Sequence, residues 1–300
     1  MKAIPLPEIA SRSGIARIRA VLESGTSVDE RDKDGRTALF RTARLGKSDC
    51  VRLLLEFHAN PNATDGRGEA PLQAAARYGH EGCVELLLEA GAEIDYCPDA
   101  EITDYSESAL CSAVRKGHQR IVDLLLNAAA SPNASTPAKR FPLIEAASRG
   151  DAATCRRLVE AGADSNQRDK SGSTALHHSV RSQSIETVRE LLDLGADVDA
   201  RDHNGVTPLW EAMSTHESVP LLSALLKAKP DLSICGPPFN YTPLEQAIEF
   251  ALDEIADLLR AAGAKEPAPI IHNDSLQVEI SVEELDRALA DELSKGKPPV

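Results

Sequence analysis

The sequence contains few aromatic residues and no long apolar run. One Trp, four Tyr and five Phe occur among 300 residues. No segment approaches the roughly 18 uninterrupted apolar residues that a membrane helix requires, and the N-terminal residues lack the apolar stretch of a secretion signal. We therefore expect no membrane insertion, no membrane partner and no classical secretion, and we expect a cytoplasmic location.

Paired cysteines and catalytic motifs are also missing. The six cysteines are scattered without a CxxC pair. This distribution fits neither a disulfide framework nor a zinc site, so we interpret them as reduced thiols. The phosphate-binding loops GxGxxG and GxxxxGKS/T, the HExxH motif and the GxSxG motif do not occur. The sequence thus predicts no cofactor, no metal and no catalytic residue.

Charge and the commonest residues describe what is present. Asp and Glu number 47 against 33 Lys and Arg, which gives a formal net charge of −14. Ala and Leu contribute 43 and 35 residues. Small and unbranched side chains on this scale favour packed helices. The excess of carboxylates repels phosphates, so we expect no nucleic-acid partner.

A repeated unit organises the chain. Each copy has a Thr, Ser, Ala or Phe two residues before an anchoring Leu. An Ala-rich stretch, a Leu-rich stretch and a polar turn follow the Leu. The intervals between anchoring leucines are 33, 38, 33, 33, 33 and 35 residues. The anchors are Leu39, Leu72, Leu110, Leu143, Leu176, Leu209 and Leu244. A fixed period of this length indicates a stacked array of short structural units.

The unit resembles the ankyrin repeat, most closely in residues 168–200, RDKSGSTALHHSVRSQSIETVRELLDLGADVDA. The T/S-x-L anchor, the Leu pair and the GAD-V-N/D turn coincide with the 33-residue period. The resemblance covers about residues 3–265. It implies an all-α solenoid of helix-turn-helix units with projecting β-hairpin fingers. It also implies a concave surface, made of fingers and first helices, that binds proteins.

The resemblance divides the chain into three parts. Residues 1–31 form an N-terminal capping repeat, residues 32–265 form seven repeats, and residues 266–300 form an acidic linker and a C-terminal helix or tail. In three repeats, His58, Ala129 and Lys229 replace the Gly of the terminal turn, where we expect a strained or differently built turn.

The C-terminal part carries eight acidic side chains against three basic ones. Ser281 and Glu284 are spaced as a capping box for a short amphipathic helix. Two interpretations remain open. The segment occupies the concave groove until a partner displaces it, or it covers the last repeat as a cap.

A row of cations follows the ends of the first helices. The position five residues after the anchoring Leu, with its successor, supplies the basic stripe, composed of Arg44, Arg77, Arg115, Lys116, Arg149 and Arg181, with Tyr78 beside it. One interpretation is a groove for an acidic partner, since a row of like charges focuses electrostatic potential. The alternative is that these cations only complement the helix dipoles.

Two fingers depart from the regular pattern. The five extra residues between Leu72 and Leu110 lie in a lengthened finger that carries Tyr105. The last finger carries Phe239 and Tyr241 beside two prolines. Loops accommodate insertions and often bind partners, so Tyr105, Phe239 and Tyr241 are candidate contacts. Neutral drift for the first finger, and aromatic filling of the last repeats for the second, are the alternatives. We expect Trp210 to lie in the core.

These observations predict a monomeric, non-catalytic module that binds a protein with an acidic surface, as an adaptor or scaffold. An inhibitor or immunity protein that neutralises a toxin or enzyme by tight binding is the alternative. An enzyme with a site placed on the repeat array is a further alternative, for which His177 and His178 are the candidates. The resemblance assigns His177, with His80 and His118, to hydrogen bonds with the backbone.

Overall fold

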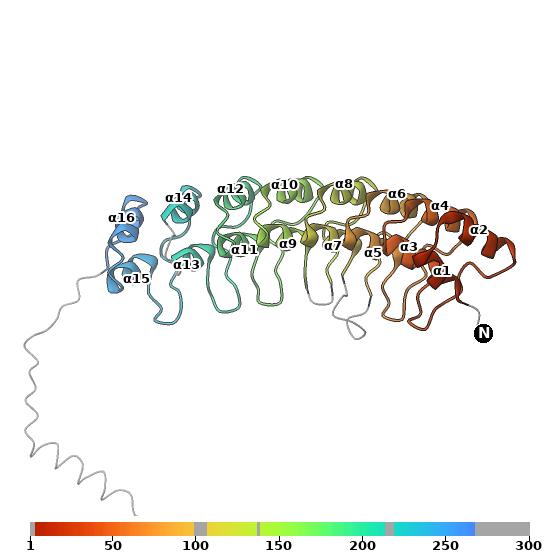
Figure 1. The fold of residues 1–300 in the computed structure, drawn as a ribbon. Helices are drawn as coiled ribbons and strands as arrows, with labels where there is room; N and C mark the ends of the chain where they lie inside the picture. The colour runs from red at the N-terminus through yellow and green to blue at the C-terminus, as the bar shows by residue number, and fades with distance from the viewer. Residues whose placement is uncertain (1–3, 99–106, 137–138, 214–218, 268–300) are drawn as a thin grey trace, which may run out of the picture. The chain divides into compact units, whose positions relative to one another are not determined.

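The computed structural model describes residues 4–98, 107–136, 139–213 and 219–267. These residues form sixteen α-helices and no β-strand, arranged as eight helix-turn-helix pairs (Figure 1). The first helices are α1 (Leu6–Arg12), α3 (Ala38–Arg44), α5 (Pro71–Tyr78), α7 (Ala109–Lys116), α9 (Pro142–Ser148), α11 (Ala175–Arg181), α13 (Pro208–Met213) and α15 (Pro243–Glu249). The second helices are α2 (Ile15–Glu23), α4 (Ser48–Glu56), α6 (Glu81–Glu89), α8 (Gln119–Asn127), α10 (Ala152–Glu160), α12 (Ile185–Asp193), α14 (Val219–Lys227) and α16 (Asp253–Ala261).

The pairs stack in chain order. First helices from α1 to α13 pack on one another in series, and the second helices form a parallel row (Figure 1). The connecting loops project from the row of first helices (Figure 1). The predicted all-α solenoid is therefore confirmed.

The anchor sequence sets the start of each first helix. The hydroxyl of Thr37 accepts a hydrogen bond from the amide of Phe40 at 3.2 Å, and that of Ser108 accepts one from Cys111 at 3.2 Å. Thr242 and Glu245 form a full capping box. These bonds satisfy amides that have no partner inside the helix. The anchoring Leu then follows one or two residues into the helix, where it is buried.

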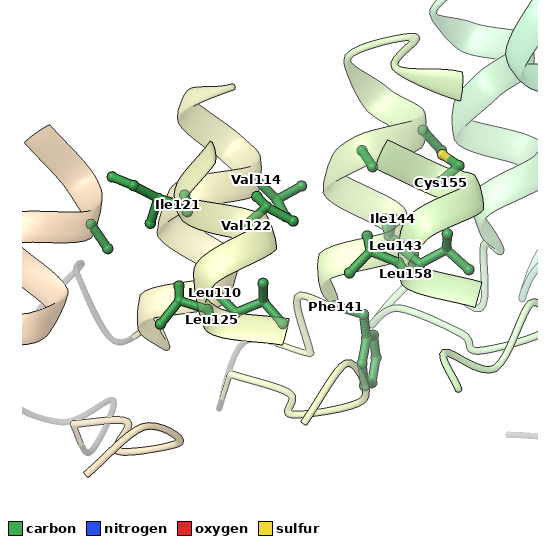
Figure 2. Close-up of a cluster of buried hydrophobic side chains, with 14 of the residues drawn as sticks. Leu110, Val114, Ile121, Val122, Leu125, Phe141, Leu143, Ile144, Cys155 and Leu158 are labelled. Atoms are coloured by element: carbon green, nitrogen blue, oxygen red, sulfur yellow. The ribbon is translucent and has the colours of Figure 1, made fainter. Parts of the chain in front are cut away.

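One continuous core runs through the stack. The buried cluster extends from Leu6 to Leu259 and takes leucines and alanines from both helices of each pair. Figure 2 shows its middle, where Leu110 of α7 and Leu125 of α8 lie close to each other and Leu143 and Leu158 repeat the pair in the next unit. Ala at the waist of the first helices permits the close packing of neighbouring units.

Asn and Asp side chains link successive repeats at the turn after each second helix. The side chain of Asn62 accepts a hydrogen bond from the amide of Glu93 at 2.8 Å, and that of Asn133 accepts one from Asp164 at 2.9 Å. The same bond recurs between other neighbours, from Asn60 to Asp29, Ser131 to Asp95, Asp197 to Asn166 and Asp231 to Asp199. The Asn or Asp that ends the GAD-V-N/D turn is therefore a structural residue between repeats.

The fingers are tight turns and not two-stranded ladders. Asp32 donates its amide to the carbonyl of Arg36 at 3.0 Å, while its carboxylate accepts the amides of Asp34 and Arg36. Gly35, at φ 73°, completes the turn. Neighbouring fingers share only isolated bonds, such as that from the Gly66 amide to the Asp34 carbonyl at 2.9 Å. The expectation of β-hairpins is thus corrected, because one closing bond per finger is too few to define strands in the described residues.

The three terminal turns without Gly adopt the left-handed conformation. His58, Ala129 and Lys229 have φ values of 61°, 66° and 56°. The corresponding Gly91 has φ 79°. The turn geometry is therefore imposed by the fold, and the expected strain is present at these three residues, since a Cβ disfavours this conformation.

We expect Ala129→Gly to raise the free energy of unfolding by about 1 kcal/mol, because the left-handed conformation costs an L-residue about 1–2 kcal/mol and the flexibility of Gly in the unfolded chain offsets part of that gain. Ala128 is a matched control, since it is also exposed but has φ −85°. Ala128→Gly should lower stability by about 0.5–1 kcal/mol. Urea unfolding followed by circular dichroism measures both. An equal loss in both variants would contradict the assignment of strain to Ala129.

The predicted C-terminal helix lies outside the described residues, so both interpretations of residues 266–300 stay predictions. In the described part, no helix has the length and apolar character needed to cross a membrane.

The cysteines outside the lengthened finger are free thiols, namely Cys50, Cys83, Cys111, Cys155 and Cys235. Burial raises the pKa of the Cys50, Cys83 and Cys155 thiols. Trp210 is 4% exposed, as expected for a core residue.

Candidate partner-binding site

A hollow of about 630 Å³ lies on the side of the first helices and fingers, across the second to fourth helix pairs. We call it the basic hollow. Six cations and two carboxylates are among its lining residues, Arg36, Arg44, Asp65, Arg67, Glu69, Arg77, Tyr78, Arg115 and Lys116. The fold thus brings together five of the predicted contact residues, Arg44, Arg77, Tyr78, Arg115 and Lys116, from the ends of α3, α5 and α7.

Arg44 and Tyr78 form one wall of the basic hollow. The guanidinium carbon of Arg44 lies 5.2 Å from the centre of the Tyr78 ring, and its Nη2 donates to the Tyr78 hydroxyl at 3.2 Å. The Tyr78 ring in turn stacks on His80 at 6.5 Å. Both Arg44 and Tyr78 are exposed. This arrangement holds a guanidinium and an aromatic face toward solvent at a defined place.

Arg77 and Arg115 form the floor and share one carboxylate. Arg115 binds Glu107 with two nitrogens, at 3.0 and 2.5 Å, and Arg77 Nη2 lies 3.5 Å from the same carboxylate. Glu107 is 5% exposed and Arg77 8% exposed. Burial opposes ionisation of Glu107, but the hydrogen bonds and charge of Arg115, together with Arg77, outweigh it and lower the pKa of Glu107. Arg77 is therefore a buried structural cation and not an exposed contact.

Glu69 lies on the other side of Arg77, with Oε1 at 3.4 Å from Nη2. Among the described residues, this oxygen is buried and accepts no hydrogen bond. Burial raises the pKa of Glu69, and the charge of Arg77 only partly compensates. The surroundings therefore favour the charged form of Glu107 and disfavour the charged form of Glu69, although both carboxylates lie beside Arg77.

The remaining cations of the basic stripe lie outside the basic hollow. Arg149 donates to the carbonyl of Arg115 at 3.0 Å, and Arg181 binds Glu211 at 2.7 Å. Arg149 therefore bridges α9 to α7, and the charge of Arg181 is matched by a carboxylate of the next repeat. The cations of the basic stripe therefore occur in successive repeats, but they make different contacts in each repeat.

A second hollow, of about 460 Å³, lies on the same side between α9 and α11. Its lining residues are Lys139, Arg140, Ile144, Glu145, Ser148, Asp169, Lys170, Ser171 and His178. Lys139, Arg140 and Lys170 are exposed cations of two fingers. The repeat pattern of the sequence did not predict these three residues as contacts, nor Arg36, Arg67 and Glu107.

His178 connects α9, α11 and a finger at the second hollow. Its Nε2 lies 2.8 Å from Asp169 Oδ2, and its Nδ1 lies 3.0 Å from Ser148 Oγ. Ser148 Oγ also donates to the carbonyl of Ile144 at 2.9 Å. Ser, His and Asp are the residue types of a hydrolase triad, but an activated serine donates its proton to the imidazole. Here the hydroxyl has a competing acceptor, the carbonyl of Ile144 in its own helix, and the three side chains link two neighbouring repeats.

The other histidines have the backbone roles that the sequence predicts. His177 Nδ1 accepts the amide of Thr174 at 3.2 Å, and its Nε2 lies 3.0 Å from the carbonyl of Val206. Burial lowers the pKa of His177. His80 and His118 reach back to the carbonyls of Arg44 and Arg77, at 3.0 and 3.2 Å. Each of these rings joins two repeats.

The unusual fingers are only partly described. Phe239 is 60% exposed, and its ring lies 5.6 Å from that of Tyr241, which is half-buried. Both residues belong to the last described finger, far along the chain from the basic hollow. Tyr105 lies outside the described residues. The described residues contain no group of three or more His, Cys, Asp or Glu side chains that could hold a metal ion.

Comparison with known proteins agrees with this architecture. The sequence profile described as Ankyrin repeats (3 copies) matches residues 8–97 and 110–202, and that described as Ankyrin repeats (many copies) matches residues 72–126. A search of curated proteins gives no match.

Two solved structures are similar to the chain. The ankyrin repeat domain of human ASB11 is 26% identical, with a TM-score of 0.65 over 79% of this chain and 100% of that domain. The ankyrin repeat domain of Bcl-3, described as a unique member of the IkappaB protein family, is 26% identical, with a TM-score of 0.63 over 74% of this chain and 98% of that domain. Since the family profile covers more than half of the sequence, the chain belongs to the ankyrin repeat family.

Proposed function

We propose that this chain is a non-catalytic adaptor or scaffold whose basic hollow binds an acidic segment of a partner protein. Ankyrin repeat domains are typically protein-interaction modules and are usually not catalytic. The observation that carries the proposal is the convergence of six cationic side chains on one hollow in a chain with a net charge of −14.

The cations of the basic hollow divide into structural and available groups. Arg77 and Arg115 hold Glu107, and Arg36 lies 3.0 Å from Asp34 and 3.6 Å from Asp65. In the part of the chain that the structure describes, Arg44, Arg67 and Lys116 are exposed and form no ion pair. These three can meet carboxylates of a partner without breaking an internal pair, and their clustered charge would accelerate association at low salt.

The Arg44→Glu, Lys116→Glu double variant should weaken partner binding by at least tenfold, which corresponds to about 1.4 kcal/mol. The loss should grow as ionic strength falls, because exposed charges are screened by salt. Arg120→Glu is the matched control, since Arg120 is an exposed cation on α8, in the row of second helices.

In the experiment, the wild type and both variants are immobilised separately, and each is used to capture partners from a lysate of the native cell. The affinity of the captured partner is then measured at several salt concentrations. Loss of the partner with the double variant and retention with Arg120→Glu would support the proposal. Equal retention on all three proteins would exclude the basic hollow as the binding site.

A further inference from the structure

We infer that the partner's segment carries two acidic clusters about 25 Å apart, one for the basic hollow and one for the second hollow. This inference rests on the proposed function and specifies its ligand. The physical basis is the presence of two cation-lined hollows on one side of the same repeat array.

The two hollows are built from equivalent positions of the repeat. Arg44, Arg77 and Arg115 follow their anchoring leucines by five residues, and Ser148 of the second hollow does the same. Arg36 and Arg140 each precede an anchoring Leu by three residues. Because equivalent positions of a solenoid share a face, both hollows open on the side of the fingers and first helices.

The second hollow has its own excess of fixed positive charge. Lys139, Arg140 and Lys170 oppose two carboxylates. One of these, Asp169, is already bonded to His178 at 2.8 Å and to the hydroxyl of Ser171 at 2.7 Å. These hydrogen bonds do not remove the charge of Asp169, so the second hollow has an excess of one Lys or Arg over its carboxylates and suits fewer partner carboxylates than the basic hollow does.

Within the described residues, direct interactions join the linings of the two hollows. Ser148 lines the second hollow, and the next residue, Arg149, donates to the carbonyl of Arg115, which lines the basic hollow. Glu145 of the second hollow is close enough to Arg115 for the two charges to interact. One extended chain segment can therefore lie along both hollows across α7 and α9.

The separation follows from the stacking of the first helices. The basic hollow is centred on α5, and the second hollow lies between α9 and α11, which is two and a half helix positions further along. Packed helices are about 8–10 Å apart, so the centres are about 25 Å apart. An extended chain covers about 3.3 Å per residue, so the centres of the two acidic clusters are about eight residues apart.

The test uses labelled peptides with two blocks of four glutamates joined by one, four or ten prolines, and a peptide with a single block. Polyproline advances about 3.1 Å per residue and acts as a semi-rigid spacer, and the two half-blocks add about 13 Å, so the block centres are about 16, 26 and 44 Å apart. Fluorescence anisotropy on the full chain measures each affinity. We expect the four-proline peptide to bind at least tenfold more tightly than the other three, through effective concentration.

Two single variants assign the effect to the two hollows. Lys116→Glu in the basic hollow and Lys170→Glu in the second should each abolish the preference for four prolines, whereas Arg120→Glu should preserve it. If affinity is independent of spacer length but still lost in the Arg44→Glu, Lys116→Glu variant, the two-cluster inference is wrong and the proposed function stands. If no glutamate peptide binds and the natural partner is unaffected by that variant, both are wrong.

Discussion

Glu107→Gln should lower the free energy of unfolding at neutral pH by about 3 kcal/mol, because removal of one partner from a buried ion pair leaves the other charge uncompensated. Glu107 balances both Arg115, at 2.5 Å, and the buried Arg77, at 3.5 Å. Its own backbone carbonyl also accepts a hydrogen bond from Gln73 at 2.7 Å. A neutral amide of the same size retains the packing and removes the charge, so the loss reports electrostatics and not volume.

The pH dependence has a defined sign. The folded chain lowers the pKa of Glu107 below its ordinary value of 4.5, so the stabilisation by Glu107 is fully present above pH 4.5 and is lost as the pH falls through the lower pKa of the folded state. The difference in stability between wild type and Glu107→Gln should therefore shrink in acid. Urea unfolding at a series of pH values measures this difference.

Glu69→Gln is the matched control in the same cluster. Burial raises the pKa of Glu69, so ionised Glu69 destabilises the fold as the pH rises through that value. Its replacement by Gln should leave stability at neutral pH unchanged or slightly increased. Comparable losses in both variants would mean that Glu107 has no special role as the counter-charge of Arg77 and Arg115.

The fold was largely predictable because its determinants recur. Five of the seven anchoring leucines have a Thr or Ser two residues before them, and Ala-rich stretches and Leu pairs repeat with them at a nearly fixed interval. The alignment of Ala129 with Gly91 and Gly195 allowed a strained turn or a differently built one, and the positive φ of Ala129 is the first of these. Alignment of the repeats could not predict that the described fingers lack paired strands, because this depends on the number of hydrogen bonds that neighbouring fingers share.

The site was predictable in position but not in burial. The five-residue offset from the anchor located Arg77 and Arg115, yet it could not distinguish the buried Arg77 from the exposed Arg44. That distinction depends on Glu107, which is thirty residues from Arg77 in sequence and approaches it only when repeats stack. One sequence signal for such contacts exists within a repeat. In three repeats, a finger residue contacts the Arg that lies eight residues after it in the first helix. These pairs are Glu69 with Arg77, Glu107 with Arg115, and Ser173 with Arg181.

Gly236→Ala should lower stability by about 2–3 kcal/mol, because overpacking a rigid core forces side chains from their preferred positions. A Cβ on Gly236 would lie 2.8 Å from Cε3 of Trp210 and closer still to Cδ2 and Cε2. The indole cannot easily retreat, since it is 4% exposed and its Nε1 donates to the carbonyl of Ile234 at 3.1 Å. The amide of Gly236 is likewise fixed, to the carbonyl of Tyr241 at 3.0 Å.

Trp210 is the single Trp of the chain, so its fluorescence reports directly on this contact. We expect Gly236→Ala to shift the emission of the folded protein to longer wavelength as the ring becomes more exposed, and Gly14→Ala to leave it unchanged. Gly14 is suited to the comparison because a Cβ there meets no atom within 4 Å. In a Trp210→Leu background the additional cost of Gly236→Ala should fall, since the two residues are in contact and their effects are coupled. If the costs of the two substitutions simply add, the loss of stability in Gly236→Ala comes from the backbone of the finger and not from contact with the indole.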